Sequence, residues 1–135
     1  MIFVDSNVLL DIFTADPDWL SWSQSALADA LLAGPVVINQ LVYAEVSVAY
    51  QQLAELDTVL SRLKIQRAEL PWEAAHLAGQ SFVKYRRRQG VKTSPLPDFY
   101  IGAHAQLAGL ALLTRDANRY RTYFPKLRLI TPTST

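Results

Sequence analysis

Short apolar runs that alternate with helical segments are the feature that most constrains the fold of this chain. Runs at residues 2–4, 36–38 and 110–113 consist of aliphatic and aromatic residues, and residues 65–70 and 127–130 predict two further strands. Short continuous apolar runs are typical of strands buried on both faces. Helical patterns lie between them, at residues 8–13, 19–33, 40–54, 56–63, 71–89, 97–108 and 118–123. The alternation predicts an α/β fold in which helices cover both faces of a parallel sheet.

The length and composition are consistent with one domain. The chain has 135 residues, half of them hydrophobic, which is enough for one compact core. Residues 131–135 are expected to form a loose tail. The absence of cysteine excludes disulfides and zinc–thiolate sites.

The apolar segments do not predict a membrane protein. The longest of them, residues 26–38, contains Asp29, Gly34 and Pro35 and is too short to cross a bilayer. Asp5 interrupts the first apolar run, and no basic segment precedes it, so a signal peptide is not predicted. We therefore expect a cytoplasmic protein that does not contact membranes.

Four acidic residues occupy positions where an α/β fold gathers functional groups: Asp5, Glu45, Asp98 and Asp116. Open parallel sheets bind their ligands beyond the carboxyl ends of the strands. Asp5 and Asp116 each lie just beyond an apolar run, and Asp98 begins a helical segment. Glu45 falls on an otherwise apolar face of its predicted helix. The four positions predict one shared pocket.

Three of these acids also have ordinary structural explanations. Asp5 can cap the helix that follows it. Asp98 can interact favourably with the positive end of its helix, and Asp116 can form a turn. Glu45 is harder to explain in this way, because glutamate is rarely buried without a partner. The pattern of four is more specific than any one of its members.

Converging carboxylates imply a cation, because they repel one another unless positive charge neutralises them. A site made only of oxygen atoms suits a hard ion such as Mg²⁺ or Mn²⁺. Asn7 and Thr114 add uncharged oxygen atoms close in sequence to Asp5 and Asp116. The pattern predicts a metal-dependent enzyme that acts on a phosphate ester.

The order of the motifs resembles that of the PIN domains. The motifs are FVDSNV at residues 3–8, Glu45 in its helix, PDFYIGAHA at residues 97–105 and LLTRD at residues 112–116. Within that family the chain resembles the VapC-type toxin ribonucleases of bacterial type II toxin–antitoxin systems. The resemblance covers nearly all of the 135 residues, as a single PIN domain.

The resemblance implies a fold, an activity and partners. The fold is a three-layer α/β/α sandwich whose central parallel sheet has about five strands in the order 3-2-1-4-5. The activity is hydrolysis of RNA phosphodiester bonds with one or two Mg²⁺ or Mn²⁺ ions. The partners are RNA, a cognate antitoxin that inhibits the enzyme, and a second copy of the chain in a homodimer.

The resemblance also implies residue roles. Asp5, Glu45, Asp98 and Asp116 take catalytic roles. The metal ligands among them are Asp5, Asp98 and Asp116, whereas Glu45 either binds a second ion or orients the attacking water. Asn7 and Thr114 take supporting roles. Many PIN domains carry a further acid shortly after the position of Asp116, where this chain has Asn118.

A basic stretch precedes the third acid in the sequence. It spans residues 84–92 and includes Arg86, Arg87 and Arg88. These arginines predict contacts with the RNA backbone. The alternative is that they are favoured only because basic side chains stabilise the carboxyl end of a helix.

Other functions fit less well. The main alternative is a non-catalytic PIN-like module that binds RNA or protein. A phosphotransferase of the haloacid dehalogenase type would have an aspartate where Asn7 stands, and a receiver domain would have paired acids after the first strand. A nucleotide-hydrolysing switch is not predicted, because the chain has no glycine-rich phosphate loop.

Overall fold

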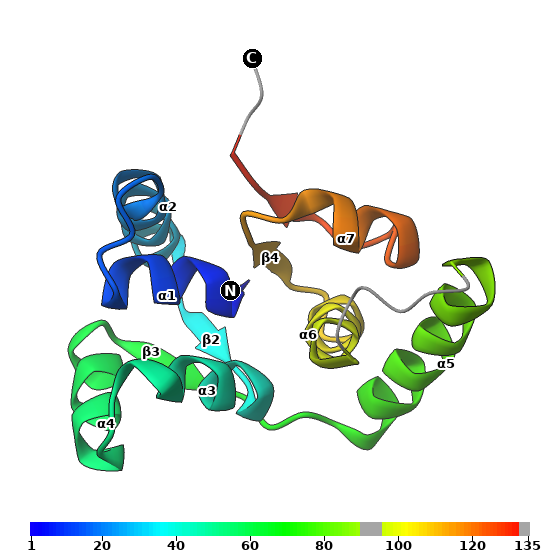
Figure 1. Ribbon diagram of the computed structural model, residues 1–135, viewed down its shortest axis with the longest axis horizontal. Coiled ribbons are helices and arrows are strands. Elements are labelled where there is room, and N and C mark those ends of the chain that lie inside the picture. The colour runs from blue at the N-terminus through cyan, green and yellow to red at the C-terminus, as the bar shows by residue number, and fades with distance from the viewer. Residues whose placement is uncertain (90–95, 133–135) are drawn as a thin grey trace.

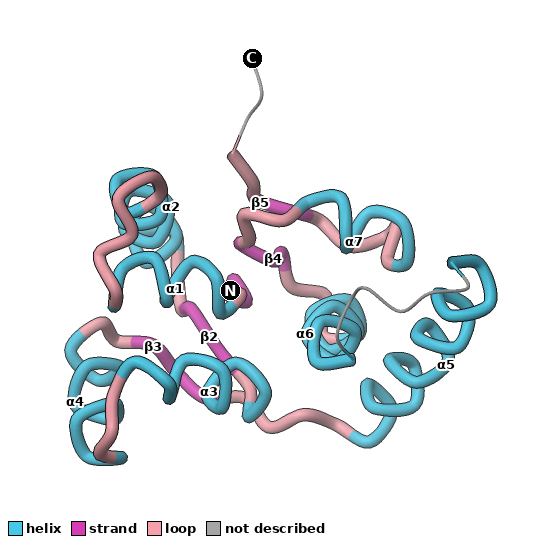
Figure 2. Tube along the Cα trace, viewed as in Figure 1, coloured by secondary structure: helices cyan, strands magenta, loops and turns pink. Residues whose placement is uncertain are grey.

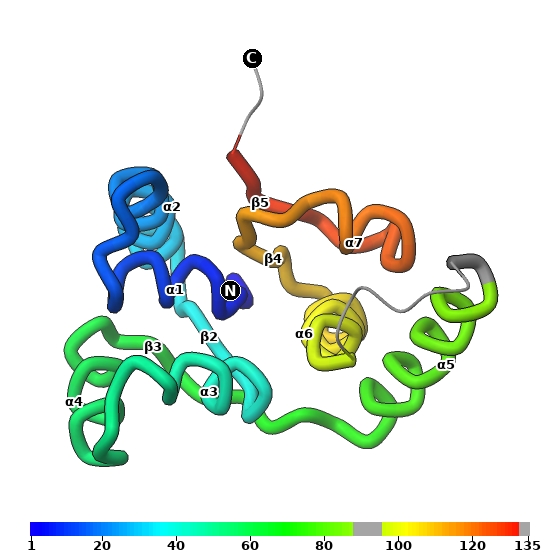
Figure 3. Tube along the Cα trace, viewed as in Figure 1, coloured from blue at the N-terminus to red at the C-terminus, as the bar shows by residue number. Residues whose placement is uncertain are grey.

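The computed structural model describes residues 1–89 and 96–132 and contains a five-stranded sheet. Its strands are β1 (Ile2–Val4), β2 (Val36–Ile38), β3 (Ile65–Arg67), β4 (Ala111–Leu113) and β5 (Leu129–Ile130). They lie in the order β3-β2-β1-β4-β5, and all neighbouring pairs are parallel. Figure 3 shows the N-terminal strand near the middle of the molecule. The predicted fold class and strand order are confirmed.

Helices cover both faces of this sheet. They are α1 (Ser6–Phe13), α2 (Leu20–Ala33), α3 (Gln40–Val46), α4 (Leu53–Arg62), α5 (Trp72–Gln89), α6 (Leu96–Leu107) and α7 (Ala117–Tyr123). In Figure 1, α1, α2 and α4 lie on one side of the strands and α5, α6 and α7 on the other. Right-handed crossovers produce this separation, because the chain moves outward along one half of the sheet and then returns to fill the other. No helix in the described ranges is both long and apolar enough to cross a membrane.

The predicted helix over residues 40–54 is interrupted. α3 ends at Val46 and is followed by a short 3₁₀ helix, η1 (Ser47–Ala49). The Ser47 hydroxyl donates a hydrogen bond to the Ala44 carbonyl at 2.6 Å, a local bond that competes with helix continuation. A new helix begins at Leu53, where the backbone N–H of Gln52 is bound by the Glu55 side chain (3.2 Å).

Two strands are shorter than predicted. They are β3 and β5, both drawn in magenta in Figure 2. β3 ends at Arg67, and the backbone soon turns to partners outside the sheet. Ala68 still donates to the Ile38 carbonyl (2.8 Å), but the N–H of Leu70 binds the side chain of Gln40 (2.9 Å). β5 begins only at Leu129. α6 begins at Leu96, one residue before the predicted start of its helix.

An aromatic cluster fixes α5 and α7 against α6. Successive ring centroids in the cluster are 5.4–6.2 Å apart. The rings belong to Phe82, Tyr85, Phe99, Tyr123 and Phe124. Because Phe99 follows Asp98 directly, the cluster also fixes the start of α6, where that acid lies.

Gly102 allows α6 and α7 to approach closely. A Cβ atom there would lie 2.6 Å from the buried Phe124 ring and 3.1 Å from the Tyr120 ring. We expect Gly102→Ala to lower the free energy of unfolding by about 1–3 kcal/mol, because the packed rings must shift. Urea denaturation measures this change.

Gly79→Ala in α5 is the matched control, because a Cβ there meets nothing within 4 Å. Alanine favours a helix over glycine by up to about 1 kcal/mol, so this variant should be neutral or more stable. Equal destabilisation of both variants would contradict the packing explanation.

Candidate functional site at the carboxyl edge of the sheet

The central strands β1 and β4 bring Asp5 and Thr114 together. Val4 and Leu113 are paired in register, and the Asp5 N–H donates to the Leu113 carbonyl at 2.9 Å. Asp5 also caps α1, since its Oδ1 accepts the Ser6 N–H at 2.8 Å. The capping explanation for Asp5 therefore holds, and it places the carboxylate at the edge of the sheet.

Asp5 is the most enclosed of the four acids. Its side chain is nearly buried, and its Oδ2 accepts hydrogen bonds from Thr114 Oγ1 and Tyr120 OH, both at 2.8 Å. Burial raises the pKa of the Asp5 carboxyl, although these hydrogen bonds oppose the shift. Burial and the neighbouring Asp5 charge raise the pKa of Tyr120 well above its usual value. Tyr120 therefore stays a protonated donor to Asp5.

Asn7 and Thr114 hold the adjoining loop. Asn7 Nδ2 lies 3.5 Å from Asp5 Oδ2 and 3.2 Å from Thr114 Oγ1. Asn7 Oδ1 accepts the backbone N–H of Arg115 (3.3 Å), and Thr114 Oγ1 accepts that of Asp116 (3.1 Å). Both predicted supporting residues thus contact Asp5 and the backbone that leads to Asp116.

Glu45 is linked to Asp5 through a serine. The Ser6 hydroxyl donates to Glu45 Oε1 at 2.9 Å and lies 3.4 Å from Asp5 Oδ1. Asn39 positions α3, because its Oδ1 caps the first turn of the helix. Burial raises the pKa of Glu45, and the charges of Asp5 and Asp98 raise it further. Glu45 is half-buried and lies within the electrostatic reach of both aspartates.

Asp98 and Asp116 are joined by an arginine. The Arg119 guanidinium donates to Asp98 Oδ2, and its Nε lies 3.3 Å from Asp116 Oδ2. Burial raises the pKa of Asp98, Arg119 opposes the shift, and the Asp5 charge adds to it. The structure therefore gathers all four predicted acids around one small region. Asp5, Glu45 and Asp98 share a raised pKa.

The donor atoms suit a hard divalent ion, and Arg119 lies between two of the acids in this structure. Within residues 1–89 and 96–132, no three Asp, Glu or His side chains are arranged to hold a metal. Arg119 supplies positive charge to Asp98 and Asp116 instead. A guanidinium bridging two carboxylates is a stand-in cation, and the oxygen-only donor set fits Mg²⁺ or Mn²⁺.

Three contributors were not predicted from sequence: Ser6, Arg119 and Tyr120. Ser6 is a residue type that is common at the start of a helix, so nothing in the sequence assigns it another role. Arg119 lies three residues after Asp116, a spacing that brings side chains together on a helix. That spacing was the available signal. Tyr120 gave no signal, since its partner Asp5 is distant in the chain.

A partly buried ion pair anchors the loop at residues 114–116 to α1. Asp11 is nearly buried and binds Arg115 through two hydrogen bonds of 2.7 and 2.9 Å. Ser23 Oγ donates to the same carboxylate at 2.7 Å, and the Arg115 guanidinium lies 5.0 Å from the Trp19 ring centroid. The pair helps fix the position of the adjacent Asp116.

The predicted basic residues lie on α5, outside the carboxylate cluster. The Arg86 guanidinium lies 5.9 Å from the Phe82 ring centroid. Arg87 is exposed near the carboxyl end of the helix. The side chain of Arg88 and residues 90–95 lie outside the described part of the chain. The structure does not bring Arg86 or Arg87 into contact with the four acids.

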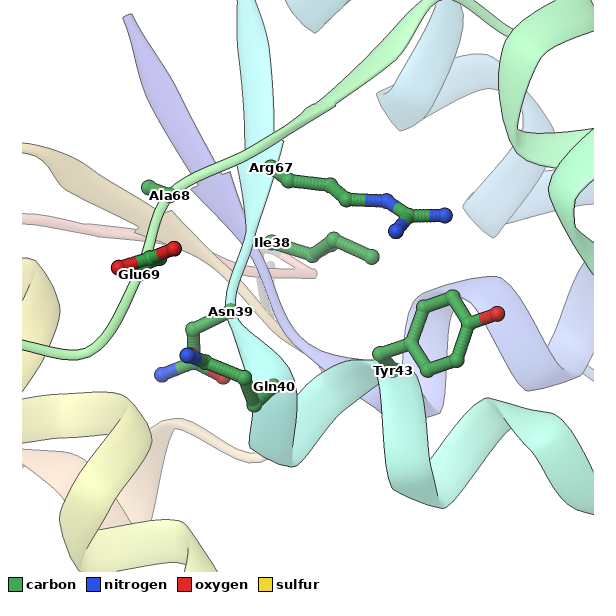
Figure 4. Close-up of a pocket in the computed structure, with 7 residues that line it drawn as sticks. All are labelled: Ile38, Asn39, Gln40, Tyr43, Arg67, Ala68 and Glu69. Atoms are coloured by element: carbon green, nitrogen blue, oxygen red, sulfur yellow. The ribbon is translucent and has the colours of Figure 1, made fainter.

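A separate pocket of about 260 Å³ lies beyond β2 and β3 (Figure 4). The Arg67 guanidinium lies 4.9 Å from the Tyr43 ring centroid, and both side chains bind Asp57, at 2.6 and 2.7 Å. None of the four acids lines this pocket. It is lined by Ile38, Asn39, Gln40, Tyr43, Arg67, Ala68 and Glu69. The carboxylate cluster, where the titratable groups gather, is therefore the stronger candidate for catalysis.

Comparison with known proteins identifies the family. The PIN domain model matches residues 2–125. The chain belongs to the PIN domain family. The match includes all four acids, so this PIN domain has its carboxylate cluster inside the family region. No curated protein matches the chain significantly in sequence.

Solved structures share the fold of this PIN domain. A toxin–antitoxin complex from Klebsiella pneumoniae is 24% identical over all of both chains, with a TM-score of 0.64. VapBC2 from Rickettsia felis, bound to a promoter DNA fragment, is 17% identical over 97% of this chain and 98% of its own, with a TM-score of 0.68. VapC20 from Mycobacterium tuberculosis, a sarcin–ricin loop cleaving toxin, is 18% identical over 95% and 99%, with a TM-score of 0.59. At these identities the likeness establishes the fold.

Proposed function

We propose that this PIN domain is the toxin ribonuclease of a toxin–antitoxin pair and hydrolyses RNA phosphodiester bonds with Mg²⁺ or Mn²⁺. The convergence of Asp5, Glu45, Asp98 and Asp116 at one edge of the sheet carries the proposal. Two proteins with the same fold support it: one belongs to a toxin–antitoxin complex, and the other is a sarcin–ricin loop cleaving toxin. A cognate antitoxin and a homodimer are part of the proposal.

The residues divide into ligands and positioning groups. Asp5, Asp98 and Asp116 would hold the ion, which supplies charge to polarise the scissile phosphate and lowers the pKa of a bound water. Thr114 and Tyr120 fix one oxygen of Asp5 through 2.8 Å hydrogen bonds.

Glu45 is proposed to orient the attacking water. Its carboxylate accepts a hydrogen bond from the Ser6 hydroxyl, and the side chain remains half-exposed to solvent. This arrangement leaves the carboxylate able to accept a proton from water at the edge of the site.

The test is cleavage of total cellular RNA by the purified chain, followed by mapping of the new ends. Discrete cleavage with Mg²⁺ or Mn²⁺ that EDTA abolishes is the expected result. Binding of RNA without cleavage would instead indicate the non-catalytic binding module. A small protein that is encoded beside this gene, binds at the four acids and inhibits cleavage would support the proposal of a cognate antitoxin.

Arg119 is expected to compete with the metal, because it bridges two proposed ligands. Arg119→Gln should tighten Mn²⁺ binding about 3- to 10-fold, since a partly exposed ion pair is worth about 1 kcal/mol. Isothermal titration of the RNA-free protein with Mn²⁺ measures this affinity.

The control is Arg121→Gln on the same helix, which removes the same charge from an exposed position. The expected result is a clearly smaller change in Mn²⁺ affinity than for Arg119→Gln. Equal changes in the two variants would show a general charge effect and rule out direct competition.

A further inference from the structure

A hollow opens from the carboxylate cluster along α7. It has a volume of about 280 Å³, and its lining includes Asp116 and Arg119 at one end. Thr122 and Tyr123 line it toward the carboxyl end of α7. The hollow therefore connects the proposed ligands with the surface between α7 and α5.

A second hollow continues from the first. It has a volume of about 400 Å³, and Thr122 and Tyr123 line it as well. Its remaining lining includes Lys84 and Arg87 of α5. Because the two hollows share Thr122 and Tyr123, they adjoin, and together we name them the α5–α7 groove. Their combined lining includes one of the four acids, Asp116, in the first hollow and the basic pair Lys84 and Arg87 in the second.

The basic side chains of α5 do not all lie in the groove. Lys84 and Arg87 are three residues apart, a spacing that places both on one helix face. Arg86 is not part of the groove lining, and its guanidinium lies over the Phe82 ring at 5.9 Å. Lys84 and Arg87 therefore line the groove, whereas Arg86, which has the same charge, does not.

We propose that the α5–α7 groove binds the backbone of the RNA strand being cut. One phosphate lies at the acids, and Lys84 and Arg87 bind another phosphate farther along the same strand. Lysine, arginine, serine and threonine side chains commonly contact phosphates and sugars of nucleic acids. The groove contains both kinds, because Ser81 and Thr122 line it beside Lys84 and Arg87. This inference rests on the proposed ribonuclease function and deepens it by giving the path of the substrate.

The test compares two double variants that remove the same charge. Lys84→Gln/Arg87→Gln changes the groove, whereas Arg62→Gln/Lys64→Gln changes an exposed arginine and an exposed lysine outside its lining. Both are made in the Asp5→Asn background, which is expected not to cleave. The dissociation constant of a labelled single-stranded octanucleotide is measured at several salt concentrations.

The groove variant should bind the octanucleotide about tenfold more weakly, and its salt slope should be shallower by about 1.4, or about 0.7 for each phosphate contact. The control should change affinity less than about threefold, because screened charges away from the strand contribute little. A dinucleotide has one internucleotide phosphate and so offers no second phosphate to the basic pair; its binding should not differ between the two variants. Equal loss of octanucleotide binding in both variants would overturn the proposal.

A parallel cleavage assay separates this inference from the ribonuclease proposal. If the wild-type chain cleaves RNA and the two double variants bind it equally, the groove inference alone fails. If the wild-type chain cleaves no RNA but the groove variant loses binding selectively, the binding site stands and the ribonuclease function fails.

Discussion

Replacing Asp5 by Asn is expected to lower the rate of RNA cleavage at least about 10³-fold, or about 4 kcal/mol in the activation barrier. Asp5 is the acid at the centre of the cluster, linked to Glu45 through Ser6 and to Thr114 directly. Asparagine keeps an oxygen that accepts hydrogen bonds but removes the negative charge that would hold the ion. Initial rates on a labelled RNA with Mg²⁺ measure the effect.

The fold should survive this change. Asp5 is only 3% exposed, and burying a charge costs free energy, so the neutral side chain should leave metal-free stability equal or higher. Urea denaturation in EDTA checks this. Asp29→Asn on the exposed face of α2 controls for the loss of one charge and should retain full activity. An Asp5→Asn protein that cleaves RNA at the wild-type rate would rule out the assignment of Asp5.

Glu45→Gln is expected to lower the cleavage rate about 10²- to 10⁴-fold, the range for loss of a positioned general base. Glutamine can still accept the hydrogen bond from the Ser6 hydroxyl, which is 2.9 Å from Glu45, so the geometry of α3 should be kept. Glutamine cannot accept a proton from the attacking water. Single-turnover rates give the loss of chemistry without the effect of product release.

Metal affinity distinguishes the two roles that Glu45 can take. If Glu45 orients water, Mn²⁺ affinity measured by titration should change much less than the cleavage rate does. A Glu45→Gln variant that loses Mn²⁺ affinity in proportion to its rate would assign Glu45 as a ligand. Ser6→Ala removes the hydroxyl that links Glu45 to Asp5, so its cleavage rate tests whether this link is needed for catalysis.

Local sequence patterns were enough for the strands and for the positions of the acids. The apolar runs that contain β1, β2 and β4 are continuous, so they are buried whichever neighbour they pair with. The strand order came from the family resemblance, because periodicity carries no information on which strands are neighbours. Asn39 directly precedes the predicted helix at residues 40–54 and is a residue type that favours helix caps, and its Oδ1 binds the first-turn N–H groups of α3.

Contacts between distant segments could not be predicted from the same patterns. Tyr120 and Asp5 are 115 residues apart, and nothing near either residue indicates the other. The end of α3 depends on a local hydrogen bond of Ser47 that competes with the helix. The sequence of the basic stretch gives the positions of the charges but not the direction in which each side chain points. Only the structure shows that Arg87 lines the groove beside α7 and that Arg86 lies over the Phe82 ring.

Anomalous scattering from crystals soaked in Mn²⁺ tests the central claim most directly, when the soak uses a concentration that supports RNA cleavage in solution. We expect an anomalous peak in contact with carboxylate oxygens of Asp5, Asp98 and Asp116, with Arg119 moved away from its bridging position. Cleavage-competent protein with no peak at these residues, and with Arg119 still bound to Asp98 and Asp116, would contradict the assignment of this cluster as the metal site.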